Sequence, residues 1–327
     1  MPVHPIPRPS IILRRLGPLL LALLLVAMPA TWAGAQAPNQ PGVATPAASP
    51  AASPGATPVA SPAASPAIAG DDPRLFGIKP DQQAWVAGRI PDVLTTYTIT
   101  VNLDPGKRSL TGSLSVDYVN DTGTTLDAVP FRLYANGGKT DTIMADSVSV
   151  NGASVDATRS VKDTVLSVPM ATPLAPGDTA TIAMTFVVLM PLDSSDQYGM
   201  LNVDSGTGTW ALAEWYPIVA GWDPANGFEL DPPSVNGDPI YSTTARYHVT
   251  VTAPEAWKIV STGDATSSSS VTDGGRTWEI ATGPVRDFTM VADEDYESVS
   301  EVVDGTTITS WYNPGGDRAG EAALTYA

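Results

Sequence analysis

Histidine and cysteine, the side chains that most often serve as catalysts and metal ligands, are nearly absent from this sequence. The 327 residues contain no Cys and only two His, His4 and His248. Disulfides, thiolate metal sites and cysteine nucleophiles are therefore excluded. A zinc site built on two or three imidazoles is excluded as well, because His4 lies at the extreme N-terminus and His248 is then alone.

His248 is out of phase with the apolar residues around it. Tyr247 and Val249 flank it, and this alternation predicts a strand on which His248 shares one face with Arg246 and Thr250. No Gly-x-Ser-x-Gly pattern accompanies it, and a lone His needs a placed partner to act as an acid or base. We interpret His248 as a residue of the sheet surface and predict no catalytic residue in this chain.

Carboxylates are the remaining candidates for chemistry. Asp293, Glu294 and Asp295 are consecutive, with Glu297 and Glu301 close behind. They could gather calcium, but they lack the alternating spacing of a calcium loop. We therefore interpret them as a solvated run of charge and predict no metal site.

The charge of the chain argues against nucleic acid as a partner. The net charge is -17, and residues 1–35 contribute three Arg and no acid. The remainder thus holds 14 basic and 34 acidic side chains, a charge of -20. Such a surface repels phosphate backbones.

Residues 1–35 have the composition of a secretory signal peptide. A basic start precedes an apolar run, and Ala33-Gly34-Ala35 offers small residues for cleavage after Ala35. The alternative is a membrane anchor, but the 15 residues from 16 to 30 are short of the ~20 needed to cross a bilayer. We expect a secreted or extracytoplasmic protein. It cannot be a lipoprotein, because it has no Cys.

Residues 36–70 form a predicted linker rich in Ala, Pro and Ser. They contain no charged residue, and Pro recurs at every fourth position from Pro46 to Pro66. The tract lacks the large apolar side chains needed to fold and should act as a semi-rigid spacer, holding the folded part near a cell wall or surface. An O-glycosylated stalk is the alternative.

Residues 71–316 show the pattern of an all-β sandwich. Apolar and polar residues alternate, and turn signals come about every ten residues. The pattern predicts strands at 97–103, 110–118, 131–134, 148–150, 164–168, 179–189, 247–251, 257–260, 277–280, 288–291, 299–303 and 306–311. No convincing amphipathic helix appears before residue 316. Residues 317–327 begin a helical pattern, which we interpret as the truncated start of a further domain.

Aromatic and proline residues crowd the irregular segment 193–242, which we name the crossing. Its rings are Trp210, Trp215, Tyr216, Trp222, Phe228 and Tyr241. Buried Trp and Tyr are the common case, so these rings are expected to plug the sandwich. A carbohydrate-binding surface is the alternative, because sugars bind to aromatic rings beside Asp and Glu.

Several segments, in order, resemble the N-terminal β-domain of the aminopeptidase N family of zinc metallopeptidases, the gluzincin aminopeptidases, in its bacterial exported form. They are 97–104 (YTITVNLD), 110–113 (LTGS), 118–120 (YVN), 131–136 (FRLYAN), 215–217 (WYP), 237–242 (GDPIYS), 245–251 (ARYHVTV), 261–263 (STG) and 285–288 (VRDF). The resemblance runs from about residue 85 to 327. It implies a saddle-like β-sandwich of antiparallel strands followed by a helix that belongs to a catalytic domain.

The resemblance also shows what this chain lacks. The family's catalytic domain carries a Gly-x-Met-Glu-Asn-type strand and a His-Glu-x-x-His helix that binds zinc, and neither motif occurs here. Zinc is thus expected only in an absent domain, and a peptide substrate only where that domain is present. The family's N-terminal domain lends a polar side chain that holds the peptide's amino group, and Glu214 is the nearest candidate.

Three hypotheses follow. The first is the signal peptide, linker and N-terminal domain of an exported aminopeptidase-like protein, inactive alone. The second is a secreted β-sandwich module that binds polysaccharide or peptide. The third is a glycosidase that uses paired carboxylates, which no feature of the sequence singles out.

Overall fold

Strands dominate the fold, as the alternating pattern predicted. The computed structural model describes residues 72–138, 141–195, 201–234, 240–271 and 274–326, all within one unit, Ala60–Ala327. The predicted signal peptide and linker lie outside the described residues, as does the 237–239 part of one resemblance segment.

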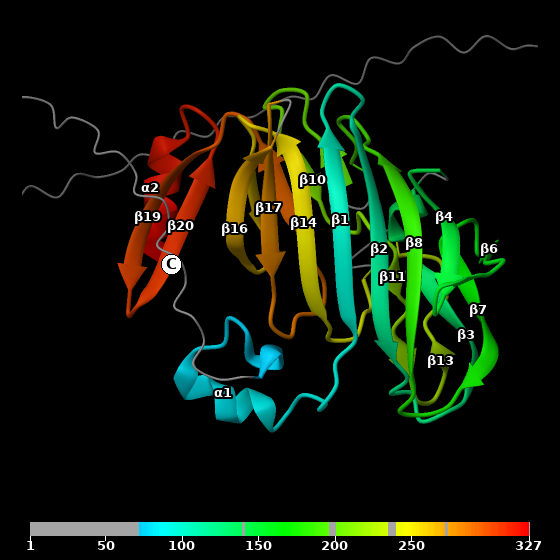
Figure 1. Cartoon of the computed structure of the whole chain (residues 1–327). Coiled ribbons are helices and arrows are strands. Elements are labelled where there is room, and N and C mark those ends of the chain that lie inside the picture. The colour runs from blue at the N-terminus through cyan, green and yellow to red at the C-terminus, as the bar shows by residue number, and fades with distance from the viewer. Residues whose placement is uncertain (1–71, 139–140, 196–200, 235–239, 272–273, 327) are drawn as a thin grey trace, which may run out of the picture. The chain divides into compact units, whose positions relative to one another are not determined.

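An eight-stranded sheet forms the largest layer of this all-β sandwich (Figure 1). Its order is β16 (Asp264–Val271), β17 (Gly275–Ala281), β14 (Arg246–Pro254), β1 (Thr96–Asp104), β2 (Ser109–Val119), β8 (Thr179–Leu189), β4 (Ile143–Val150) and β5 (Ala153–Ser154). Side chains alternate between its two faces, and Tyr97, Ile99, Val101 and Leu103 of β1 are all buried.

Two four-stranded sheets contribute to the same core. One has the order β15 (Lys258–Ser261), β18 (Met290–Asp293), β10 (Trp210–Leu212) and β9 (Leu201–Val203). The other has the order β11 (Ile218–Val219), β3 (Leu126–Arg132), β7 (Val165–Leu174) and β6 (Thr158–Ser160). Buried residues of all three sheets form one hydrophobic cluster, so the sandwich has a single core.

The two remaining sheets are hairpins. One pairs β12 (Trp222–Asp223) with β13 (Gly227–Phe228) inside the crossing. The other pairs β19 (Glu297–Val303) with β20 (Thr306–Tyr312) around a turn at Asp304 and Gly305. Both are antiparallel.

One pairing departs from the antiparallel expectation. β1 pairs with β2 in antiparallel fashion but with β14 in parallel, with Thr96 opposite Arg246. A parallel pair needs a long connection, and here the intervening chain builds much of the other two sheets. β14 therefore returns beside β1 in the same direction.

The sequence pattern did not predict several elements: helix α1, strand β16 and the short strands β5, β6 and β9 to β13. Helix α1 (Pro80–Ala87) has no buried residue, so no apolar stripe could reveal it; it begins with Pro80, in a position suited to a helix start. Strand β16 is exposed throughout and lies at the sheet edge, so it has no alternation to detect.

The predicted C-terminal helix is present. Helix α2 (Asp317–Tyr326) packs on β20 and β19, and its one buried residue is Gly320. Figure 1 shows it beside that hairpin.

Candidate functional site

The crossing and the end of β3 enclose a cavity of about 430 Å³, which we name the crossing cavity. Its lining combines two aromatic rings, one guanidinium and three carboxylates: Arg132, Tyr134, Asp223, Glu229, Asp231 and Tyr241, with Asn226, Pro232, Pro233 and Ser234. It is the cavity into which the alternative binding hypothesis would place a ligand.

Arg132 is buried at the edge of this cavity. It is 1% exposed, and its Nη1 and Nη2 donate to the carbonyl oxygens of Glu229 and Asp231, each at 2.7 Å. The guanidinium also lies 4.8 Å from the centre of the Tyr134 ring. Burial lowers the pKa of Arg132, which stays far above neutral because Arg is the most basic side chain. Arg132 thus holds the backbone of the 229–231 segment with a full positive charge.

Tyr134 fastens the opposite wall. Its hydroxyl accepts from the backbone N–H of Tyr241 at 3.0 Å and donates to the carbonyl of the same residue at 3.2 Å. Burial raises the pKa of Tyr134, and nearby Glu214 and Glu229 push it in the same direction. The Tyr134 hydroxyl is therefore neutral at pH 7 and makes both hydrogen bonds to the backbone of Tyr241.

The rim of the crossing cavity is acidic. Asp223 Oδ1 accepts from the N–H groups of Ala225 and Asn226, each at 2.9 Å, and Glu229 Oε1 accepts from the N–H of Asp231 at 3.0 Å. These carboxylates are therefore held in place by the backbone. Three carboxylates, those of Asp223, Glu229 and Asp231, line the cavity with one buried guanidinium. This lining favours an ammonium or another cation over an anion.

Glu214 is buried just behind this region. It lies between β10 and β11, is 2% exposed and has φ of 59°, an uncommon conformation for a residue other than Gly. Its charge acts on Tyr134, a residue of the crossing cavity, although Glu214 does not line that cavity. The structure thus brings Glu214 close to the cavity wall, while its binding role stays a prediction.

The aromatic residues of the crossing divide into two groups. Trp210, Trp215 and Tyr216 are buried, and Trp215 Nε1 donates to the carbonyl of Phe288 at 3.1 Å. Plugging of the sandwich is thereby confirmed for these three. Trp222 and Phe228 are half-buried and contact each other edge to face at 4.9 Å, and Tyr241 is exposed.

His248 lies where the alternation predicted. It is exposed on the face opposite buried Tyr247 and Val249. Its Nε2 lies 3.2 Å from Arg246 Nη2. Partial burial, followed by the charge of Arg246, lowers the pKa of His248, which keeps the ring neutral at pH 7.

The acidic run differs from its prediction at one residue. Asp293 is buried, not solvated, because it ends the inner strand β18. Its carboxylate accepts from Thr209 Oγ1 at 2.6 Å and from Asn313 Nδ2 at 3.0 Å. It joins β18 to the segment that precedes α2. In the described part of the chain, no three His, Cys, Asp or Glu side chains are grouped to hold a metal.

Sequence reasoning missed Arg132 and Tyr134 as cavity residues. The available signal was an Arg inside an apolar stretch, Pro130-Phe131-Arg132-Leu133, since a buried charge needs a dedicated set of partners. Those partners lie about 100 residues later in the chain, beyond any local pattern.

Comparisons with known proteins gave matches only among solved structures. No family model and no curated protein matches the sequence. An M1 zinc metallopeptidase from Deinococcus radiodurans is 19% identical, with a TM-score of 0.46 over 68% of this chain and 47% of that chain. A two-domain M1 zinc metallopeptidase bound to L-arginine is 18% identical, with a TM-score of 0.47 over 68% and 48%. The chain spans about half the length of these structures.

No helix among the described residues is both long and apolar enough to span a bilayer.

Proposed function

We propose that this chain is the N-terminal β-domain portion of an exported zinc metalloaminopeptidase-like protein and that it is inactive alone. The observation that carries the proposal is the order of the sequence segments that resemble this family, from residue 97 to residue 288. The all-β sandwich, with a single core shared by three sheets, is consistent with it.

In this proposal the chain carries no zinc site of its own. The residues present do not fit a zinc site, since the sequence holds two His, far apart, and the described part has no cluster of ligands. In this proposal the zinc and the attacking water belong to a further domain, and a peptide is the substrate only in its presence.

Within that larger protein, Glu214 holds the free amino group of the peptide. A carboxylate is the natural partner of an ammonium, and Glu214 lies behind the acid-rimmed cavity whose wall includes Tyr134. The position of Glu214 in the core, next to buried Trp215, gives it a fixed location.

The proposal also includes export. A signal peptide cleaved near Ala35 releases the chain, and the proline-rich linker holds the folded unit near the cell wall or surface. In this proposal the protein is not a lipoprotein, because the chain has no Cys to carry a lipid.

The inactivity can be tested with the purified full chain, by measuring its zinc content and its hydrolytic activity. We expect no stoichiometric zinc by elemental mass spectrometry and no hydrolysis of amino-acid anilides. Chelator-sensitive turnover would overturn the proposal, because it would require a metal site within these 327 residues.

Binding of L-alaninamide, followed by NMR titration, tests Glu214. We expect weak saturable binding that N-acetylation of the ligand abolishes and that Glu214→Gln weakens about tenfold, since an ion pair is lost. Glu255→Gln, on the surface at a distance from the crossing cavity, is the matched control. Equal affinities of the Glu214→Gln and wild-type chains would refute this role.

A secreted binding module is the second candidate, favoured by the crossing cavity and by the partly exposed rings of Trp222 and Tyr241. It predicts retention on a polysaccharide or peptide column that Trp222→Ala abolishes. Trp210→Ala cannot serve as a probe, because Trp210 belongs to the core. Absence of retention would refute this candidate.

A further inference from the structure

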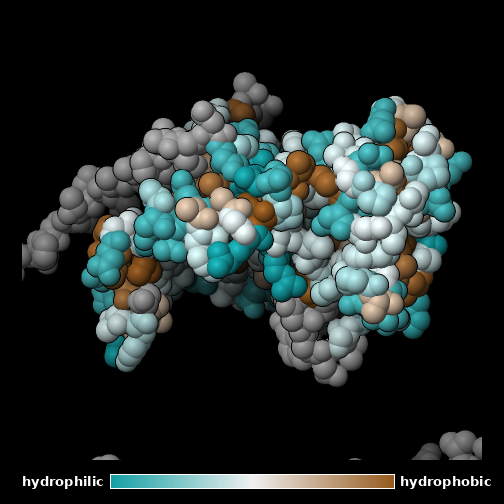
Figure 2. Space-filling model, turned by 90° about the horizontal axis from the view of Figure 1, so that it is seen from below, coloured by the Kyte–Doolittle hydropathy of each residue, from teal (hydrophilic) through white to brown (hydrophobic). Residues whose placement is uncertain are grey.

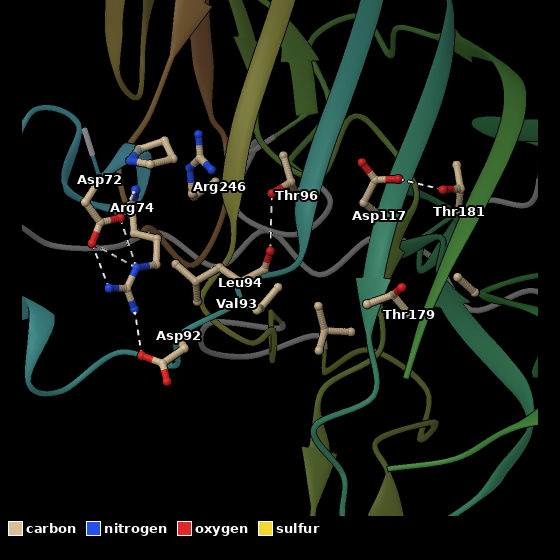
Figure 3. Close-up of a pocket in the computed structure, with 13 residues that line it drawn as sticks. Asp72, Arg74, Asp92, Val93, Leu94, Thr96, Asp117, Thr179, Thr181 and Arg246 are labelled. Carbon is tan, nitrogen blue, oxygen red and sulfur yellow. Dashed lines mark hydrogen bonds and ion pairs between the residues drawn. The ribbon is translucent and has the colours of Figure 1, made fainter. Parts of the chain in front are cut away.

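A second cavity, of about 350 Å³, lies between the outer face of the eight-stranded sheet and the segment 72–94 (Figure 3). We name it the outer cavity. Its polar lining residues are Asp72, Arg74, Asp92, Thr96, Asp117, Thr179, Thr181 and Arg246. This cavity has no role in the function proposed above.

Its floor is a row of four residues in register across four strands. Arg246 on β14 is opposite Thr96 on β1, Thr96 is opposite Asp117 on β2, and Asp117 is opposite Thr181 on β8. Neighbouring strands are about 4.8 Å apart, so the backbones of Arg246 and Asp117 are separated by about 10 Å. The oppositely charged side chains of Arg246 and Asp117 therefore lie on the same face of the sheet, with Thr96 between them.

The charges of segment 72–94 are used within that segment. Arg74 pairs with Asp72 at 2.6 Å and with Asp92 at 3.4 Å, and its Nη1 donates to the carbonyl of Pro91 at 2.8 Å. The hydrogen bonds lower the pKa of Asp72 and raise that of Arg74. Arg74, Asp72 and Asp92 are therefore paired with one another within the segment.

Arg246, in contrast, has no ion pair among the residues that the structure describes. Its Nε is buried without a hydrogen-bond partner, and its Nη2 faces only the neutral ring of His248. Burial lowers the pKa of Arg246, and Asp72 opposes this effect only from a distance. A partly desolvated guanidinium that has no carboxylate in direct contact is unfavourable, and a carboxylate fits its planar fork of donors.

Asp117 offers the complementary end. Its Oδ1 accepts from Thr181 Oγ1 at 2.7 Å, and the side chain is exposed, so its Oδ2 is accessible to a ligand from solvent. Figure 3 shows Asp117 and Arg246 on either side of Thr96. A ligand that reaches both would need an acceptor group at one end and a donor at the other.

We propose that the outer cavity binds a small organic carboxylate with a hydrogen-bond donor at its far end, held by Arg246 and Asp117. An ammonium, as in a zwitterionic dipeptide, or a hydroxyl, as in a uronic acid, provides that donor. The apolar side chains of Val93, Leu94 and Val119 line the space between the polar groups. The site is independent of the proposed relation to peptidases.

Isothermal titration of the full chain with glycylglycine and with D-glucuronate tests the proposal. We expect saturable binding of at least one probe, weakened about tenfold or more by Arg246→Gln and by Asp117→Asn, because each variant removes a charge-assisted hydrogen bond. Arg276→Gln, which alters another arginine of the same sheet, is the matched control and should bind as the wild type does. Binding of glycylglycine alone identifies an ammonium as the donor, and binding of glucuronate alone identifies a hydroxyl.

Two results would overturn the proposal. One is the absence of saturable binding of both probes, and the other is unchanged affinity in a folded Arg246→Gln chain. Should Arg246→Gln fail to fold by circular dichroism, Arg246→Lys keeps the charge but loses the fork, and the same loss of affinity is expected.

Discussion

Several tyrosines are buried in the sandwich core, and their hydroxyl groups make different hydrogen bonds. Tyr216 accepts from the backbone N–H of Phe288 at 3.0 Å, whereas the Tyr247 hydroxyl holds no backbone group in the residues described. We predict that Tyr216→Phe lowers the free energy of unfolding by about 1–3 kcal/mol, because a buried N–H loses its acceptor. Tyr247→Phe should change it by less than about 1 kcal/mol. Urea unfolding measures both, and equal effects would contradict this assignment.

The same tyrosines predict a loss of stability at alkaline pH. Burial raises the pKa of Tyr97, Tyr216 and Tyr247 far above its ordinary value. Above about pH 10 the unfolded chain loses phenolic protons that the folded chain keeps, so stability falls by about 1.4 kcal/mol per pH unit for each such residue. Below that pH their contribution is constant.

Urea midpoints at about pH 8 and about pH 11, with phenolate absorbance recorded in parallel, measure this effect. We expect part of the phenolate signal to appear only on unfolding. Titration of every tyrosine near pH 10 in a chain that remains folded would contradict the burial.

The contacts of Arg132 allow us to predict how much this side chain stabilises the rim of the crossing cavity. Replacing it with Met removes two charge-assisted bonds to the carbonyls of Glu229 and Asp231. The relief of a buried charge offsets part of this loss, so we expect a net destabilisation of about 2 kcal/mol and faster hydrogen exchange in the 229–231 segment. Arg276→Met, at a half-buried position whose ion pair with Glu255 is partly exposed, should change stability by about 1 kcal/mol or less. Unchanged exchange in the first variant would show that Arg132 does not hold the rim.

The candidate sites could be predicted only where the deciding information is local. The outward position of His248 and the burial of Trp215 follow from alternation and from side-chain size. Arg132, Tyr134 and Arg246 acquire their roles from partners that the fold brings together, such as Thr96 and Asp117 beneath the outer cavity. Register across strands, which sets those neighbours, is not visible in a single sequence.

At the scale of elements, the long strands with one buried face were predicted, whereas the short strands β9 and β10 and the fully exposed β16 were not. β1 and β2 alternate cleanly, so the strands at 97–103 and 110–118 were predicted from their apolar positions. β16 carries a run of serines, and α1 has no buried residue. Both lack the burial periodicity on which a prediction from the sequence pattern depends.

The packing of α2 on β20 gives a prediction for an element. A Cβ at Gly320 would overlap the ring of Tyr312. Gly320→Ala should therefore separate the helix from the hairpin, although Ala favours helix by about 1 kcal/mol. In a Tyr312→Ala background the overlap is absent, so the same substitution should stabilise the helix.

Hydrogen exchange of the α2 amides in the single and double variants measures this reversal of sign. Slower exchange in Gly320→Ala alone would contradict the packing.

At the scale of the whole molecule, the sandwich closes its core but leaves apolar surface near its C-terminal elements. Val302 and Val303 on β19 and Trp311 on β20 are exposed. Figure 2 shows an apolar patch on the side where Figure 1 places this hairpin. Exposed apolar patches commonly mark contact surfaces. In the proposed larger protein, a following domain would cover these side chains.

We propose that this chain is one domain of a larger zinc aminopeptidase-like protein. The most direct measurement is to read the coding sequence beyond the codon for Ala327. We predict an open frame that continues into a Gly-x-Met-Glu-Asn-type strand and a His-Glu-x-x-His helix, the two parts required to bind substrate and zinc. A stop codon directly after Ala327 would contradict the claim.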